Sequence, residues 1–222
     1  NKYDKGRELV QKLLAGTNIA LITDAGTPGI SDPGEELVKM AYEAGIEVTS
    51  LPGACACVTA LTLSGLSTRR FVFEAFLPPD KKEHKLALER LKNETRTMIV
   101  YEAPHHLLKT LRELLETLGN RRLTLCRELT KKHETAWQTT IEDAITRYEQ
   151  EDPKGECVLV IEGRSQKEIE DEAKAAFEEI SIEEHMKRYE DQGIARKEAM
   201  KLVAKDRGVT KRDIYQYLLG KE

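Results

Sequence analysis

Hydrophobic positions in the first third of the chain alternate between two spacings. Leu9 and Leu13 recur at helical spacing, and a continuous apolar run at residues 19–22 follows, as in a buried strand. The alternation continues and predicts helices at residues 5–15, 34–44 and 52–63 and strands at residues 18–23 and 46–51. Strands and helices that alternate with short connections are typical of a parallel α/β sheet.

The middle of the chain has a further series of strands and helices, and two prolines end its first strand. The stretch RRFVFEAFLPP, at residues 69–79, holds a strand that ends at Pro78 and Pro79. Beyond it, the pattern predicts helices at residues 81–92, 104–118 and 141–150 and strands at residues 97–101, 122–128, 134–139 and 157–161. This order indicates a second α/β domain with a mixed sheet.

The last part of the chain has a helical pattern throughout. The acidic, Ala-rich stretch at residues 166–179 is expected to form a linker helix. Three further helices follow, and Ser181 with Glu184 resembles a capping box at the start of the first of them. We therefore predict an α/β protein with a parallel domain at residues 1–68, a mixed-sheet domain at 69–165, a linker helix at 166–180 and a helix-turn-helix-like tail at 181–222.

The composition of the 222-residue chain is that of a protein that forms a core. Hydrophobic residues make up 40% and charged residues 33%, and no apolar run approaches the roughly 18 residues that span a bilayer. We therefore expect no membrane segment, and we find no signal peptide. The chain opens on Asn1 inside a predicted helix and lacks an initiator Met, which favours a fragment of a longer protein.

The four cysteines do not have the spacing of a metal site. Cys55 and Cys57 form a C-x-C pair, and no histidine lies near them at zinc-finger spacing. Cys126 and Cys157 stand alone in apolar runs. We expect small buried thiols in a reducing, cytoplasmic compartment and no bound metal.

The net charge of −4 hides a strong asymmetry along the chain. Residues 142–183 carry 14 acids against 5 bases, whereas residues 121–133 carry 5 bases against 1 acid and residues 185–222 carry 10 bases against 6 acids. Local basic segments can bind phosphate even on an acidic protein, so the net charge alone does not exclude a nucleic-acid partner.

The loop DAGTPGISDPG, at residues 24–34, follows the first predicted strand. Ligands of parallel α/β sheets bind outside the carboxyl ends of the strands, and glycines let the backbone approach a ligand closely. The loop has neither the P-loop nor the G-x-G-x-x-G pattern and contains no base, so it does not indicate a phosphate cradle. Backbone amides with Asp24, Thr27 and Asp32 suit a ligand that bears hydroxyls and an ammonium group; the alternative is a tight structural connection.

A second loop of the same kind follows the next predicted strand. In LPGACACVTAL, at residues 51–61, Pro-Gly turns the chain and a helix opens with Ala54, Cys55 and Ala56. Small side chains at the start of a helix leave room for a ligand against the backbone. The alternative is close packing of this helix on the sheet.

Five motifs occur in a familiar order along the whole chain: DAGTPGISDPG, LPGACACVTALTLSGL, VYEAPHHL, CRELTKKHE and KGECVLVIEG. Together they resemble the tetrapyrrole methylase superfamily, the class III methyltransferases, and within it the branch of ribosomal RNA small subunit methyltransferase I. The resemblance implies two α/β domains with S-adenosylmethionine between them. It also implies 2'-O-methylation of a cytidine in the decoding region of 16S rRNA, and a homodimer.

The resemblance implies cofactor contacts for the two loops. Gly26, Thr27 and Ile30 match positions that touch the methionine and ribose ends of the cofactor, and Gly26-Thr27-Pro28 replaces the Gly-Asp-Pro of the wider superfamily. Cys55 and Ala56 match the pair of small residues that follows the Pro-Gly turn in the family and contacts the cofactor.

Two later positions complete the implied cofactor site. Tyr101 and Glu102 match the position that closes over the adenosine, and Glu162 with Gly163 lies where the final strand approaches the adenine. The family begins with a further strand, central in its sheet, and a Pro-Gly-type loop that this sequence lacks.

The motif RELTKKHE supplies candidate groups for the transfer itself. A ribose hydroxyl is a poor nucleophile, so a base or a nearby cation should help it to react. We expect Arg127 and Lys131 to hold an rRNA phosphate or the developing alkoxide, and Glu128 or Glu102 to orient or deprotonate the hydroxyl. The alternative is a surface ion-pair cluster.

The basic tail distinguishes the functions that this family supports. Its cations could contact phosphate, namely Arg196, Lys197, Lys201, Lys205, Lys211 and Arg212. The alternative is a solvated helical bundle. We expect an rRNA ribose methyltransferase acting on the 30S subunit. A tetrapyrrole C-methyltransferase and a non-enzymatic RNA-binding or assembly protein are the alternatives.

Overall fold

The computed structural model describes residues 2–219, with the side chains at positions 2, 3, 173, 176 and 178 outside the description. The chain divides into two compact units after Gly163. None of the described helices is long and apolar enough to cross a membrane.

A five-stranded mixed sheet forms the centre of the first unit, with the strand order β1-β2-β5-β3-β4. The strands are β1 (Phe71–Phe76), β2 (Thr97–Glu102), β3 (Arg122–Arg127), β4 (Thr135–Thr140) and β5 (Cys157–Ile161). β1 and β2 are parallel, and β5 pairs antiparallel with both β2 and β3. β1, β2 and β3 therefore point the same way, and we call the end of the sheet where they finish the carboxyl edge.

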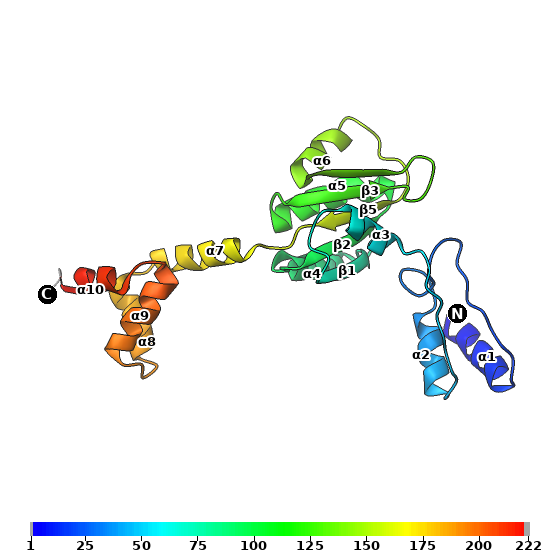
Figure 1. Ribbon diagram of the computed structural model, residues 1–222, viewed down its shortest axis with the longest axis horizontal. Helices are drawn as coiled ribbons and strands as arrows, with labels where there is room; N and C mark the ends of the chain where they lie inside the picture. Colours follow the sequence, from blue (N-terminus) through cyan, green and yellow to red (C-terminus); the bar gives the residue numbers. More distant parts are fainter. Residues whose placement is uncertain (1, 220–222) are drawn as a thin grey trace. The chain divides into compact units, whose positions relative to one another are not determined.

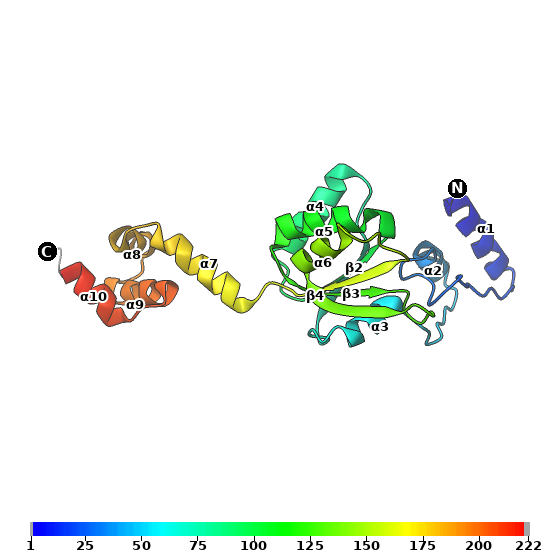
Figure 2. The ribbon, with the colours of Figure 1, turned by 90° about the horizontal axis from the view of Figure 1, so that it is seen from above.

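Helices cover both faces of this sheet, as Figure 2 shows. On one face lie α4 (Lys81–Lys92), α5 (Pro104–Leu118) and α6 (Ile141–Tyr148), and on the other lies α3 (Ala56–Leu63). The strands supply both layers because their side chains alternate between faces. In β2, Met98 and Val100 pack toward α5, and Ile99 packs toward α3. The predicted elements from residue 69 onward are confirmed.

The α5 helix shows why the sequence folds in this way. Pro104 occupies the first turn, where its missing N–H costs no hydrogen bond. Leu107, Leu111, Leu114 and Leu118 then follow at helical spacing, and all four are buried. The resulting apolar stripe packs on the sheet and contributes to the main core of the unit.

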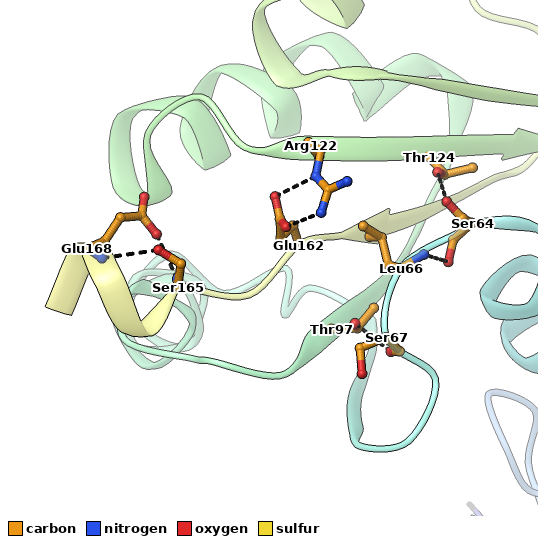
Figure 3. A network of polar contacts seen from close by, with 9 residues as sticks. All are labelled: Ser64, Leu66, Ser67, Thr97, Arg122, Thr124, Glu162, Ser165 and Glu168. Carbon is orange, nitrogen blue, oxygen red and sulfur yellow. Dashed lines mark hydrogen bonds and ion pairs between the residues drawn. The ribbon is translucent and has the colours of Figure 1, made fainter. Parts of the chain in front are cut away.

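The segment between α3 and β1 is tied to the sheet by backbone carbonyls (Figure 3). Thr124 donates to the Ser64 carbonyl at 3.1 Å, and Thr97 donates to the Ser67 carbonyl at 2.7 Å. The α3 helix also packs directly on β3 and β5. The helix of the predicted first domain thus shares a core with the sheet of the second, and the boundary before Arg69 stays a prediction.

The two strands predicted before α3 do not form, so these two strand predictions are wrong. Residues 18–23 and 46–51 make no ladder with any strand among the described residues. Ile22 and Leu51 are both 83% exposed. A strand needs a neighbour to satisfy its backbone N–H and C=O groups, and neither segment has one here. Apolar runs alone cannot supply that neighbour.

The helices predicted in the same region do form. They are α1 (Lys2–Leu14) and α2 (Glu35–Glu43), and they pack side by side (Figure 1). Val10 of α1 and Ala41 of α2 are buried.

In its described part, up to residue 219, the second unit contains four helices: α7 (Gln166–Glu178), α8 (Ile182–Glu190), α9 (Arg196–Arg207) and α10 (Lys211–Leu219). Ser165 and Glu168 form a capping box at the start of α7, also drawn in Figure 3. The α7 helix packs on α9, so the segment predicted as a linker is part of the helical unit. The core of the unit comprises Met186, Ala199, Val203, Ala204 and Ile214.

A buried histidine connects three helices of the second unit. The His185 ring is 1% exposed and stacks on Phe177, with ring centroids 4.2 Å apart. Its Nε2 lies 3.2 Å from the Asp206 carboxylate, and Arg207 donates to its Nδ1 at 3.3 Å. Burial, followed by the Arg207 charge, lowers the pKa of His185 below 6.5, and Asp206 opposes this shift.

The stability of this unit should therefore fall in mild acid. The lowered pKa means that the unfolded chain binds the His185 proton more readily, so stability is lost as pH falls below about 6.5. Hydrogen exchange of α8–α10 amides, corrected for intrinsic rates, should show less protection at pH 5.5 than at pH 7.5. His185→Phe should reduce this difference, whereas the exposed-site control His133→Gln should retain it. Equal acid sensitivity in His185→Phe would contradict the assignment.

Candidate functional site

The carboxyl edge gathers most of the residues that the sequence marks as functional. β1 ends at Phe76, β2 at Glu102 and β3 at Arg127, all at this edge. Ligands of α/β sheets bind at such an edge because the loops that follow the strands converge there.

An aromatic and thiol cluster lies on the α3 side of the edge. The Tyr101 ring meets Phe73 at 5.0 Å and Phe76 at 5.7 Å between centroids, both edge-to-face. Cys55 Sγ and Cys57 Sγ are 3.3 Å apart and contribute to the same cluster. Burial, followed by a hydrogen bond to Cys55, raises the pKa of Cys57 to about 11, and burial raises the pKa of Tyr101. Both groups are therefore uncharged at neutral pH.

The two glycine loops meet beside this cluster. The Thr27 amide donates to the Ala54 carbonyl at 2.9 Å, and the Thr27 hydroxyl donates to the same oxygen at 3.1 Å. A Cβ on Gly26 would lie 3.1 Å from that oxygen, and one on Gly53 would lie 2.9 Å from the Thr27 hydroxyl. Both positions require glycine for this approach. Gly26 and Thr27 therefore lie next to Ala54, which directly precedes the N-cap of α3 at Cys55.

The other predicted residues of these loops have fewer structural constraints. Ala56 is the first residue of α3, directly after Cys55. Asp24 and Ile30 lie at exposed positions of the loop at residues 24–34, where Thr23 donates to the Gly26 carbonyl at 2.8 Å. Their proposed ligand contacts stay predictions.

Glu102 is at the same edge, but on the opposite face of the sheet from Tyr101. It is 7% exposed, and its two carboxylate oxygens accept from the Thr110 hydroxyl at 2.6 Å and the Ala103 amide at 2.8 Å. The alternation of β2 explains this separation, because consecutive side chains point to opposite faces. The Glu102 carboxylate is therefore already held by the start of α5.

Arg127 shares the face of Glu102 across the intervening strand. The register places Glu102, Cys157 and Arg127 in one row over β2, β5 and β3. Arg127 Nε donates to the Thr135 hydroxyl at 3.3 Å, and the Arg127 charge opposes the rise that burial causes in the pKa of Tyr148. Burial raises the pKa of Cys157 to about 12, with Arg127 again opposing. This row is polar at both ends and neutral in the middle.

The loop after β3 holds the remaining charged candidates. Lys131 Nζ lies 3.1 Å from a Glu128 carboxylate oxygen, and the Glu134 carboxylate accepts from the Thr130 amide at 2.6 Å. Glu128 and Thr130 have φ values of 49° and 64°, which non-glycine residues adopt at a cost of about 1–3 kcal/mol each. The loop is thus a strained, internally bonded turn that presents Lys131 at the carboxyl edge.

Glu162 is not brought to this edge. β5 runs antiparallel to its neighbours, with Cys157 opposite Glu102 and Ile161 opposite Met98, so its last residue is at the other end of the sheet. There Glu162 accepts from Arg122 Nε at 2.9 Å, as Figure 3 shows. The strand register therefore does not support the prediction that Glu162 borders the same site. Periodicity could not reveal this, because it carries no strand direction.

The sequence did not single out several residues of the edge. They are Cys57, Phe73, Phe76, Tyr148 and Cys157. The sequence suggested only buried thiols for Cys57 and Cys157, and it is the tertiary contacts that bring all five residues near the candidate site. Among residues 2–219, no three potential metal ligands come together.

The comparisons with known proteins agree with this arrangement. The profile of the tetrapyrrole (corrin/porphyrin) methylases matches residues 2–145. A ribosomal RNA small subunit methyltransferase I from Synechocystis sp. is 44% identical over all of this chain and 78% of its own length. One from Halalkalibacterium halodurans is 47% identical over 97% of this chain and 74% of its own length. The chain belongs to the tetrapyrrole methylase family.

Within the tetrapyrrole methylase family, the ribosomal RNA small subunit methyltransferase I branch is the one that this chain matches. The crystal structure of the methyltransferase CobJ has the same fold, with a TM-score of 0.57, 73% of this chain and 72% of the other covered, and 19% identity. That likeness concerns the fold alone. The identities of 44% and 47%, over 100% and 97% of this chain, assign the branch.

Proposed function

We propose that this chain transfers a methyl group from S-adenosylmethionine to the ribose 2'-hydroxyl of a cytidine in 16S rRNA. The observation that carries the proposal is the meeting of two glycine loops and a charged turn at one sheet edge, in a chain so similar to named rRNA methyltransferases. We assign the aromatic and thiol cluster to the cofactor and the charged turn after β3 to the RNA acceptor.

The residues of the α3 side fit the proposed cofactor. Gly26 lies close to the Ala54 backbone carbonyl and Gly53 lies close to the Thr27 hydroxyl, so a Cβ at either position would intrude. The uncharged Cys57 and Tyr101 present a neutral wall to a cationic ligand. S-adenosylmethionine supplies an electrophilic methyl group when bound. Loops that meet through Thr27 and Ala54 would orient it by backbone contacts.

The charged turn supplies the groups for the acceptor. We assign to Lys131 and Arg127 the binding of an rRNA phosphate or the stabilisation of negative charge on the ribose oxygen. Glu128 stands beside Lys131 and is the carboxylate we assign to orienting the hydroxyl. Glu102, with both oxygens occupied by the fold, is better suited to positioning the start of α5. Most of the rate would come from holding the reacting atoms about 3 Å apart.

Replacement of the basic turn residues tests the transfer. Lys131→Gln and Arg127→Gln should each lower the rate of methylation by about 100-fold, the usual effect of removing one group that stabilises developing charge. The measurement is incorporation of labelled methyl groups from S-adenosylmethionine into unmethylated 30S subunits, with the position mapped in the rRNA. Lys132→Gln is the matched control and should retain activity. A fully active Lys131→Gln would end its proposed role.

A cofactor titration tests the meeting of the two loops. Gly26→Ala should weaken S-adenosylhomocysteine binding about tenfold or more, because its Cβ would meet the Ala54 carbonyl. Gly16→Ala is the control: its φ of 89° nearly equals the 86° of Gly26, but nothing lies within 4 Å of its Cβ. Calorimetry should show a loss for Gly26→Ala alone. Equal affinities in both variants would argue against a cofactor at this loop.

We also assign the helical tail to rRNA binding. Lys197, Lys201 and Lys205 are exposed at intervals of four on α9, so they share one face of the helix. Arg196 begins the same helix, and Lys211 and Arg212 begin α10. The acceptor we propose is the 30S subunit, and the same assignment places the protein in the cytoplasm. A homodimer is proposed from the family resemblance.

The salt dependence of binding tests this role of the tail. Replacing Lys197, Lys201 and Lys205 by Gln should reduce the slope of log affinity against log salt by about 2 for single-stranded rRNA segments. Lys5→Gln with Lys12→Gln is the control, because these exposed lysines lie on α1, outside the tail, and pair with Glu8 on their own helix as Lys201 pairs with Glu198 on α9. Fluorescence anisotropy across a salt series gives the slopes. An unchanged slope in the tail variant would mean that these lysines do not contact rRNA and that the tail is only a solvated helical bundle.

A further inference from the structure

The Glu128 carboxylate, in the turn after β3, has one oxygen bound within the fold and one that is not. Its Oε1 accepts from Lys131 Nζ at 3.1 Å, whereas no described residue donates a hydrogen bond to its Oε2. The Glu128 side chain is nevertheless only 26% exposed, against 56% for Lys131. It is therefore a largely enclosed carboxylate with an open acceptor, unlike Glu102, whose two oxygens are both occupied.

The enclosure of Glu128 depends on a glycine from a distant part of the chain. A Cβ built on Gly155 would overlap Glu128 Oε1 and would lie 2.7 Å from both its Cδ and its Cγ. Any side chain at position 155 would therefore displace the Glu128 side chain from the Cγ outward. Gly155 also has a φ of 76°, in the left-handed region that glycine adopts freely.

The start of β5 holds Gly155 in this place. Cys157, two residues later, is 1% exposed and pairs with Arg127 on one side and with Glu102 on the other. Its Sγ lies 3.6 Å from the Gly155 carbonyl oxygen, within reach of a sulfur hydrogen bond. Because β3 and β5 are antiparallel, the chain before Cys157 runs beside the chain after Arg127, which begins with Glu128. The central strand of the sheet thus fixes Gly155 next to Glu128.

The turn after β3 holds Glu128 from its own side. Glu128 has a φ of 49°, and its carbonyl accepts from the Lys131 amide at 2.9 Å. Such a backbone conformation is unfavourable for a non-glycine residue and persists only where surrounding contacts impose it. Here it brings the Glu128 side chain against both Lys131 and Gly155.

We propose that Gly155 is a positioning residue for the methyl transfer. Its bare backbone leaves room for the Glu128 carboxylate in one orientation, with Oε1 at Lys131 and Oε2 open to accept a hydrogen bond from the ribose 2'-hydroxyl. The proposal rests on the proposed function and deepens the role of Glu128 in it. A hydroxyl that donates to Oε2 keeps the lone pairs of its oxygen for attack on the methyl group. Misplacement of such a group by about 1 Å can cost about 100-fold in rate.

Replacement of Gly155 tests this contact. Gly155→Ala should lower kcat for methylation of unmethylated 30S subunits by about 10- to 100-fold, because the added Cβ displaces the carboxylate. The KM for the subunit and the Kd for S-adenosylhomocysteine should stay within about twofold, since the groups that bind them are untouched. Gly45→Ala is the matched control and should keep the wild-type kcat. Gly45 has a φ of 71°, but nothing lies within 4 Å of its Cβ.

Removal of the Glu128 side chain separates positioning from a general effect on the fold. In Glu128→Ala, the three atoms that the new Cβ would meet are absent. Adding Gly155→Ala to this variant should therefore change kcat by less than about twofold, the non-additivity of two residues that act through one group. Single-turnover measurements with excess protein make these low rates accessible. A full additional loss in the double variant would show that Gly155 acts on the fold and would overturn the inference.

The wild-type chain separates a failure of this inference from a failure of the proposed function. A wild-type chain that methylates no 30S subunits refutes the proposed function and the inference with it. Equal kcat values for the wild type and Gly155→Ala, beside a slow Glu128→Ala, overturn the inference alone. A Gly155→Ala variant that loses S-adenosylhomocysteine affinity together with kcat also overturns it, because the glycine would then support the cofactor site.

Discussion

The antiparallel register of β5 between β2 and β3 is the constraint on which the rest of the first unit depends. All five residues of β5 are buried, and the strand is hydrogen-bonded on both sides. It fixes β2 and β3 in the same direction, so the loops after them meet at one edge. It also sends its own last residues to the opposite edge, which is why Glu162 pairs with Arg122 far from Glu102 and Arg127.

The edge separates two chemistries onto two faces. On the α3 side, Tyr101 and the Cys55–Cys57 pair make a neutral wall beside the glycine loops. On the α5 side, Glu102 and Arg127 occupy a charged row. Alternation along a strand makes this division unavoidable, because neighbouring residues cannot share a face.

Local strain is concentrated at the same edge. Among residues 2–219, the three non-glycine residues with positive φ are Ala75, Glu128 and Thr130, and all three lie where β1 or β3 finishes. Such conformations persist only where surrounding contacts impose them. Here a bulge in β1 between Phe73 and Ala75 brings Phe76 to Tyr101, and the turn after β3 presents Lys131. The strain at Glu128 and Thr130 therefore lies in the turn that is proposed to contact RNA.

The sequence by itself determined the elements from residue 69 onward, the helical tail and the family, because these depend on spacing and on motifs that are local. It also placed Cys55 at a helix start and Tyr101 near a strand end. Only the tertiary structure decided that residues 18–23 and 46–51 form no strands, since a strand exists only with a partner. Strand direction and register likewise separated Glu162 from the site and brought Phe76 into it, because hydrogen-bond pairing between distant segments leaves no trace in local spacing.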